Sequence, residues 1–229
     1  MINILLEGYE INAPWLYDDL KKYILPNQSV AVMAFSFRDS EVKNLKDWDS
    51  LYSKEKGIYY NGIVDGFTAY GISEDNITFV NYFKDTKESA VQKIQKADIL
   101  YFTGGRPDRM MDRIKEFDLT DVLRKHKGII MGYSAGAVIQ LSEYHLSPDK
   151  DYKEFQYYDG LGYLDDFYLE VHYEETAVQN EAIQRVIAER GKTVYATVLQ
   201  SGAILVDNGN LKLLGDVKVF DRWNYGEKI

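Results

Sequence analysis

The segment from Gly128 to Val138 constrains the fold of this chain more than any other. A short apolar run at 129–131 leads into Gly132-Tyr-Ser-Ala-Gly136, and residues that can start a helix follow. The pentapeptide fits G-x-S-x-G, and a strand, a sharp turn and a helix are the context in which that pattern forms a nucleophile elbow. Glycines on both sides let the backbone bend tightly. We therefore expect Ser134 to project above unclaimed backbone N–H groups, where its hydroxyl can attack a carbonyl and the resulting oxyanion is stabilised.

Strand and helix patterns alternate through the first two-thirds of the chain. Apolar runs predict strands at 2–6, 29–35, 76–82, 98–102 and 167–173. Helices are predicted to begin at Pro14, Thr86, Pro107 and Thr176. Residues 142–165 are expected to form an irregular excursion, and the tail from 193 to 220 to form four short strands with a hairpin turn at 207–210. This order predicts an α/β fold, a three-layer sandwich with a mostly parallel sheet, built as one domain over residues 1–229.

Composition narrows the class of protein. The chain has 229 residues, no cysteine and a formal net charge of −9. Disulfides and thiolate zinc sites are thus excluded, and binding of nucleic acid through a basic surface is disfavoured. We expect a cytoplasmic protein with no membrane segment, because the N-terminus lacks a signal-peptide pattern and no apolar run approaches the roughly 20 residues of a membrane span. The 19 tyrosines are read mainly as packing and surface residues, with a peptide- or sugar-binding tyrosine cleft as the alternative.

A second glycine turn lies about thirty residues before the elbow. The strand at 98–102 ends in Thr103-Gly-Gly-Arg-Pro107. Two glycines between a strand and a helix leave backbone N–H groups open to an anion or a developing oxyanion; a plain tight turn is the alternative. No G-x-x-x-x-G-K-[ST] is present, so a nucleotide P-loop is not predicted.

A serine hydroxyl needs a base to take its proton, and the chain has three histidines. His126 lies in a charged helix end and is interpreted as a surface residue, while the place of His145 in the excursion leaves its role open. His172 ends an apolar strand downstream of the serine, where α/β hydrolases place their base. A half-buried strand histidine bonded to the backbone is the alternative for His172.

The combination of Gly132-Tyr-Ser-Ala-Gly-Ala137, Tyr101-Phe-Thr-Gly-Gly105 and Val171-His-Tyr173 resembles the dipeptidase E and cyanophycinase family of serine peptidases. The resemblance covers essentially the whole chain and implies a class I glutamine amidotransferase-like (flavodoxin-like) fold. It implies Ser134 as nucleophile and His172 as base, with the N–H groups of Gly105 and Ala135 as the oxyanion hole. It also implies that no metal or cofactor is required.

The chain departs from the family pattern at several positions. Arg106 and Pro107 follow the glycine pair where the family commonly has a small residue and Asn, and Glu174 follows the histidine where an arginine is often found. A preference for an N-terminal aspartate is therefore in doubt, because carboxylate recognition normally uses arginine. Ser201 stands where some relatives carry the acid of the triad. The nearest counterpart of the acid assigned in dipeptidase E is Asp149, and Asp159, Glu170 and Glu174 are further candidates. A backbone carbonyl or Gln200 is the alternative group to orient the ring, and without a carboxylate the rate can fall by about 10⁴.

Three functions stay open at this point. The leading hypothesis is a serine hydrolase that cleaves a short peptide or related small amide through an acyl-enzyme on Ser134, with Gly104, Arg106 and Arg38 as candidate substrate-binding residues. The second is a non-catalytic relative that keeps the elbow and binds a ligand, and the third is an amidotransferase-like domain that serves a partner protein. A monomer or homodimer that binds neither nucleic acid nor membranes is expected.

Overall fold

A mostly parallel sheet organises the computed structural model, which describes residues 1–223. Its strands lie in the order β10-β9-β1-β5-β4-β2-β3, and β8 pairs with β9. The last three strands of the chain are β8 (Phe167–Tyr173), β9 (Thr193–Asp207) and β10 (Asn210–Phe220). Strands β1, β5, β4, β2 and β3 run parallel to one another, whereas β9 is antiparallel to both β1 and β10. The strands of the parallel part are β1 (Ile2–Leu6), β2 (Val30–Met33), β3 (Ile77–Val80), β4 (Ile99–Phe102) and β5 (Ile129–Tyr133).

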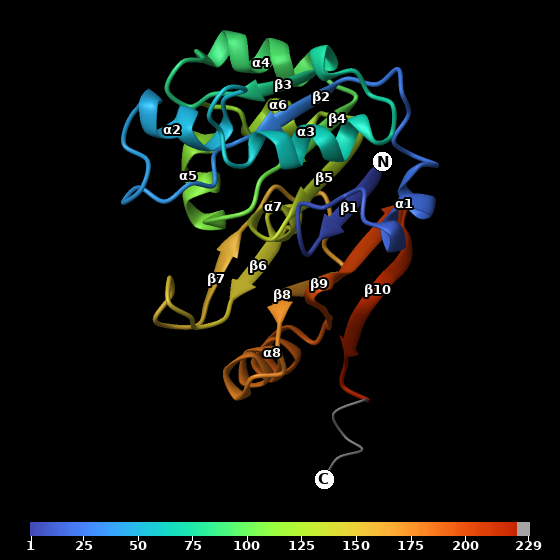
Figure 1. Ribbon diagram of the computed structural model, residues 1–229. Helices are drawn as coiled ribbons and strands as arrows, with labels where there is room; N and C mark the ends of the chain where they lie inside the picture. The colour runs from blue at the N-terminus through green and yellow to red at the C-terminus, as the bar shows by residue number, and fades with distance from the viewer. Residues whose placement is uncertain (224–229) are drawn as a thin grey trace.

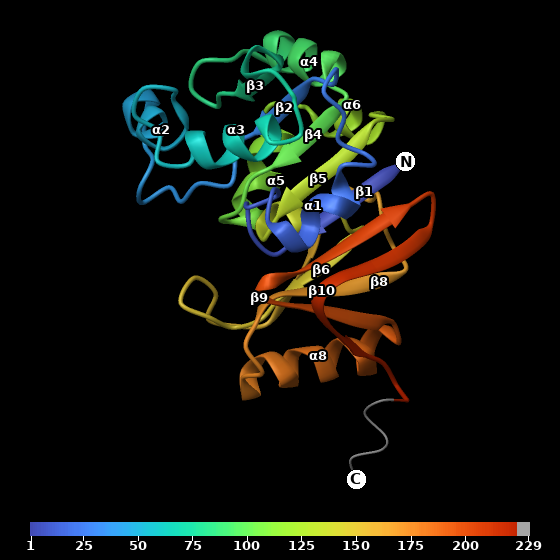
Figure 2. The same cartoon turned by 45° about the vertical axis from the view of Figure 1, so that its right-hand side comes forward.

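Helices cover both faces of the parallel strands (Figures 1 and 2). One layer contains α1 (Pro14–Leu20), α2 (Leu45–Tyr52) and α3 (Tyr60–Thr68). The other contains α4 (Lys87–Lys96), α5 (Pro107–Glu116), α6 (Thr120–Arg124) and the short α7 (Ala135–Val138). Strands β1, β2, β4 and β5 are almost entirely buried, which explains their largely apolar sequences, whereas the edge strand β3 exposes Thr78. The predicted three-layer α/β architecture is confirmed.

A second group of elements lies below the parallel strands in Figure 1. It comprises β8 (Phe167–Tyr173), α8 (Ala177–Arg190), the first half of β9 (Thr193–Asp207) and the second half of β10 (Asn210–Phe220). Thr176 caps α8 through its side chain, as the sequence predicts, and Gly191 ends it in a left-handed conformation. A separate apolar cluster, which includes Ile183 and Val186, holds α8 against β8 and β9.

Two predicted regions differ from the observed structure. Within the expected irregular excursion, β6 (Glu143–Leu146) and β7 (Gln156–Asp159) form an antiparallel hairpin. The sequence of this hairpin is rich in tyrosine and polar residues, so it lacks the apolar runs that predict the parallel strands. The four short strands expected in the tail are two long ones, because β9 continues through a left-handed Gln200 and β10 through an irregularity between Gly215 and Val217. The turn at 207–210 is correctly predicted, with positive φ at Asn208 and Gly209.

Candidate active site

Three strands of the sheet deliver the candidate residues to one edge. Leu6 at the end of β1 pairs with Tyr133 at the end of β5, and Phe102 at the end of β4 pairs with Gly132. Because these strands are parallel, the residues that follow them emerge together at the carboxyl edge, where open α/β sheets bind ligands. Glu7, Ser134 and the turn at 103–105 are therefore neighbours despite their separation in sequence.

The elbow holds Ser134 in a conformation that few non-glycine residues adopt. Its φ is 51° and its ψ is −113°, and its N–H donates to the Leu6 carbonyl at 2.9 Å. Both flanking positions need glycine because neither has room for a Cβ. A Cβ on Gly132 would lie 2.4 Å from the Gly136 carbonyl oxygen. A Cβ on Gly136 would lie 2.1 Å from the Phe102 carbonyl oxygen. The predicted strand-turn-helix is thus present, and its strain is localised at the serine.

His172 reaches the serine from the other group of elements. The register between β8 and β9 shifts between Glu170 and Tyr173, and His172 itself has a φ of 55°. Gln179 on α8 donates from Nε2 to the His172 carbonyl oxygen at 2.8 Å and so supports this backbone. The Ser134 Oγ lies 2.7 Å from the His172 Nε2, which is the contact that the sequence predicted.

Glu7 is the carboxylate that meets the other side of the imidazole. Its Oε1 contacts the His172 Nδ1, and its Oε2 accepts from the His172 backbone N–H and from the Thr197 hydroxyl, each at 2.9 Å. Only 3% of Glu7 is exposed. An ionised carboxylate only accepts hydrogen bonds, so Nδ1 carries the proton and Nε2 is free to accept from Ser134.

These surroundings set the proton affinity of the imidazole. Burial lowers the pKa of His172, but the hydrogen bond to Glu7 and the negative charges of Glu7, Glu170 and Glu174 outweigh it, so the pKa is raised above 6.5. A base must be neutral to accept a proton. Activity that depends on His172 should therefore be lost as the pH falls through a value above 6.5.

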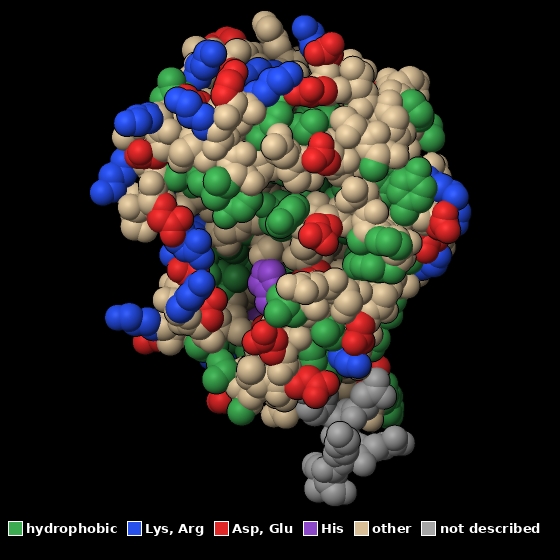
Figure 3. Space-filling model, in the orientation of Figure 1, with side chains coloured by type: hydrophobic (Ala, Val, Ile, Leu, Met, Phe, Trp, Pro, Cys, Tyr) green, Lys and Arg blue, Asp and Glu red, His purple; other side chains and the backbone are tan. Residues whose placement is uncertain are grey.

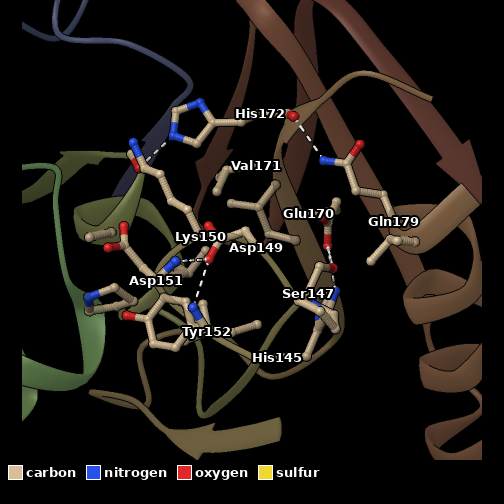
Figure 4. A pocket seen from close by; sticks show the side chains of 18 of the residues that line it. His145, Ser147, Asp149, Lys150, Asp151, Tyr152, Glu170, Val171, His172 and Gln179 are labelled. Carbon is tan, nitrogen blue, oxygen red and sulfur yellow. Dashed lines mark hydrogen bonds and ion pairs between the residues drawn. The ribbon is translucent and has the colours of Figure 1, made fainter. Parts of the chain in front are cut away.

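The prediction that Asp149 is the acid is wrong, because its carboxylate binds its own loop and Glu7 is the carboxylate that contacts the His172 ring. The Asp149 Oδ1 accepts from the backbone N–H groups of Asp151 and Tyr152, at 2.7 and 2.8 Å. Figure 4 shows this carboxylate turned to its own loop rather than to the His172 ring. Asp149 thus orders the loop at 147–152, and Glu7 occupies the place of the acid. The available signal was that Glu7 directly follows β1, a strand expected in the same parallel sheet as the elbow.

The two candidate oxyanion donors are both available. Within residues 1–223, neither the Gly105 nor the Ala135 backbone N–H donates to another group. Gly105 has a φ of 138°, and a Cβ there would lie 2.4 Å from the Ser36 carbonyl oxygen. That same oxygen accepts from the Arg106 N–H at 2.7 Å. The glycine turn is therefore held against the residues that follow β2, and the Gly105 N–H stays free to donate.

Gly105→Ala is expected to lower kcat by roughly 10² to 10³, the usual effect of losing one oxyanion donor. The added methyl group is excluded by the Ser36 carbonyl, so the turn must move. Steady-state kinetics of peptide hydrolysis would measure the loss. Gly209→Ala is the matched control, because Gly209 also has a positive φ, a Cβ there meets no atom within 4 Å, and it lies in the turn at 207–210, outside the lining of both clefts. Equal activity of the two variants would contradict a role for this turn.

The three candidate substrate-binding residues have different surroundings. Arg38 lies beside Ser134 but is paired with Asp151, at 3.1 and 2.6 Å from its Nε and Nη2. Arg106 donates to Asp108 and to the Tyr152 hydroxyl, so its guanidinium is turned to α5 and the 147–152 loop. Gly104 lies beside the Tyr133 ring. Both arginines are thus already neutralised by carboxylates.

Two clefts meet at Ser134 and His172. The loop-side cleft has a volume of about 780 Å³ and lies between the 147–152 loop, β8 and the start of α8. The tyrosine-side cleft, of about 330 Å³, lies between the Gly104–Gly105 turn and aromatic side chains. Ser134, His172, Gly105 and Arg38 line both clefts. In Figure 3 this face is hollowed beside a histidine, with hydrophobic side chains along the hollow.

Residues 1–223 lack two kinds of feature. No helix in that range is both long enough and apolar enough to cross a bilayer. No group of three or more His, Cys, Asp or Glu side chains in the same range is arranged to hold a metal ion.

The fold and the Ser-His-Glu constellation define a class of α/β hydrolytic protein in which an elbow serine faces an imidazole. The chain belongs to peptidase family S51, the dipeptidase E family, whose model matches residues 52–214. It is accordingly a serine-type peptidase by family.

Two crystal structures share the fold. One is a protein assigned as peptidase E from Listeria monocytogenes EGD-e, with 16% identity, a TM-score of 0.64, and coverage of 94% of this chain and 98% of that one. The other is a peptidase from an acI-B1 Actinobacterium, with 15% identity, a TM-score of 0.66, and coverage of 96% and 89%. No curated protein matches the sequence.

Proposed function

We propose that the chain hydrolyses short peptides or related small amides through an acyl-enzyme on Ser134, in the manner of dipeptidase E. The observation that carries the proposal is the alignment of the Ser134 Oγ, 2.7 Å from the His172 Nε2, with the buried Glu7 on the Nδ1 of the same ring. The two clefts that meet there have volumes suited to a ligand of a few residues.

The reaction follows from the roles of these atoms. The His172 Nε2 takes the hydroxyl proton as the Ser134 Oγ bonds to the substrate carbonyl carbon, and the N–H groups of Gly105 and Ala135 stabilise the oxyanion. The tetrahedral intermediate collapses, the C–N bond breaks, and the imidazolium gives its proton to the leaving amine. Water, deprotonated by His172, then attacks the ester carbon, and Ser134 leaves with its proton restored.

Glu7 weakens the case for the non-catalytic alternative. That alternative depended on the lack of an acid for His172, and Glu7 provides a carboxylate in contact with the ring. Glu7 keeps the ring in the tautomer that accepts from serine and stabilises the imidazolium formed during the reaction.

A fluorophosphonate probe tests the proposal directly. We expect covalent labelling of Ser134, located by mass spectrometry of the labelled peptide, that is absent in Ser134→Ala and strongly slowed in His172→Ala. A folded sample that reacts with neither the probe nor short peptides would favour a ligand-binding protein that keeps the elbow without the activity.

A further inference from the structure

The tyrosine-side cleft carries an inference beyond the proposed reaction, on which it builds. Large side chains form its wall beside Ser134, His172 and the Gly104–Gly105 turn. These wall residues are Tyr9, Leu51, Tyr52, Tyr59, Tyr133 and Leu199. We propose that this cleft is a specificity subsite that binds a large apolar or aromatic side chain of the peptide residue next to the scissile bond.

The exposure of the wall supports a ligand-binding role. Tyr9, Tyr59 and Leu199 are among the few large hydrophobic residues on the described surface, with 39%, 38% and 41% of their areas exposed. All three converge on one cleft that Ser134 also lines. Apolar side chains grouped around a concavity next to reactive groups are typical of a binding pocket rather than of scattered surface residues.

The wall is held in place by packing. The Tyr9 and Tyr133 rings meet edge to face, with their centroids 5.9 Å apart, and the Tyr52 and Tyr59 rings are tilted against each other, with their centroids 5.8 Å apart. Tyr133 is fixed against Gly104, where a Cβ would lie 2.4 Å from its ring. Aromatic rings in such pairs favour a further ring at their edges or faces. The cleft is therefore preformed for a planar or bulky apolar group.

The charges of the cleft disfavour an acidic side chain. Arg38 is the only Lys or Arg among its lining residues in the described chain, and both its Nε and its Nη2 already donate to Asp151. Glu7 and Glu41 line the same cleft and would repel a carboxylate. Burial raises the pKa of Tyr52 to about 12, so that phenol is neutral at physiological pH. An aspartate placed here would lose hydration, and no Lys or Arg of the described lining is free to pair with it.

Peptide binding to the Ser134→Ala protein tests the subsite independently of catalysis. Calorimetric titration with the dipeptides Phe-Ala, Ala-Phe, Ala-Ala, Asp-Ala and Ala-Asp would compare the two positions. We expect one Phe dipeptide to bind at least about tenfold more tightly than Ala-Ala, from burial of the ring, and both Asp dipeptides to bind no better than Ala-Ala.

A second substitution assigns the preference to the wall. In the Ser134→Ala protein, adding Tyr59→Ala should reduce the ratio of Phe-dipeptide affinity to Ala-Ala affinity at least about fivefold. Adding Ile58→Ala instead should leave this ratio unchanged. Ile58 is the matched control because it is adjacent in sequence, 70% exposed and outside the cleft lining. Equal binding of the Phe and Ala dipeptides, or a preference for Asp, would overturn the inference.

Hydrolysis by the wild-type protein separates the two proposals. Cleavage with no aromatic preference in kcat/KM would retain the proposed reaction and reject the subsite. Aromatic-selective binding to Ser134→Ala without any hydrolysis by the wild type would retain the subsite and reject the reaction.

Discussion

Ser134→Ala is expected to lower kcat for peptide hydrolysis by about 10⁶, the scale measured when the nucleophile of a serine protease is removed. The hydroxyl is the atom that forms the acyl-enzyme, and within the described chain its Oγ has the His172 ring as its hydrogen-bond partner. Because alanine keeps the Cβ, the positive φ of the elbow is no more strained than before, and the thermal unfolding midpoint should change little. Initial rates of amine release and a melting curve measure the two effects.

His172→Ala distinguishes a coupled pair from an isolated serine. Residues that act as a unit are non-additive, so the double variant Ser134→Ala/His172→Ala should be no slower than Ser134→Ala alone. Additive losses would mean that His172 acts on another step. Undiminished turnover by Ser134→Ala would remove the nucleophile from the mechanism altogether.

Glu7→Gln is expected to lower kcat by about 10⁴ and to change the pH profile. An amide can present its NH₂ to the His172 Nδ1, which stabilises the tautomer that cannot accept from serine. Loss of the Glu7 hydrogen bond and charge leaves only the charges of Glu170 and Glu174 to oppose burial, so the pKa of His172 should fall from its raised value. The acid limb of kcat/KM, which lies above pH 6.5 in the wild type, should shift to lower pH in the variant.

Asp149→Asn is the control for Glu7→Gln. Its carboxylate accepts backbone hydrogen bonds within the 147–152 loop, so its loss should cost at most about tenfold and leave the acid limb in place. The reverse pattern, a large loss at Asp149 and a small one at Glu7, would restore the assignment made from the family resemblance.

The sequence predicted those parts of the site that local pattern determines. The apolar run before Gly132 and the glycine spacing predict the elbow, and the position of His172 at a strand end predicts that its ring lies near Ser134. Glu7 belongs to no local pattern, and its only signal is its position directly after the strand at 2–6. It becomes a neighbour of His172 when β1 pairs with β5 and the end of β8 turns back toward them. Asp149 was chosen by sequence correspondence, but its loop supplies two backbone N–H groups that hold its carboxylate elsewhere.

The proposed nucleophile and base are supported by different halves of one strand. The second half of β9 pairs with β1, next to the sheet position of Ser134, while its first half pairs with β8, which carries His172. Strand β9 therefore joins the two groups of elements, and the left-handed Gln200 lies between the half that pairs with β8 and the half that pairs with β1. A displacement of one half of β9 relative to the other would therefore move the imidazole away from the hydroxyl even if the elbow kept its own conformation.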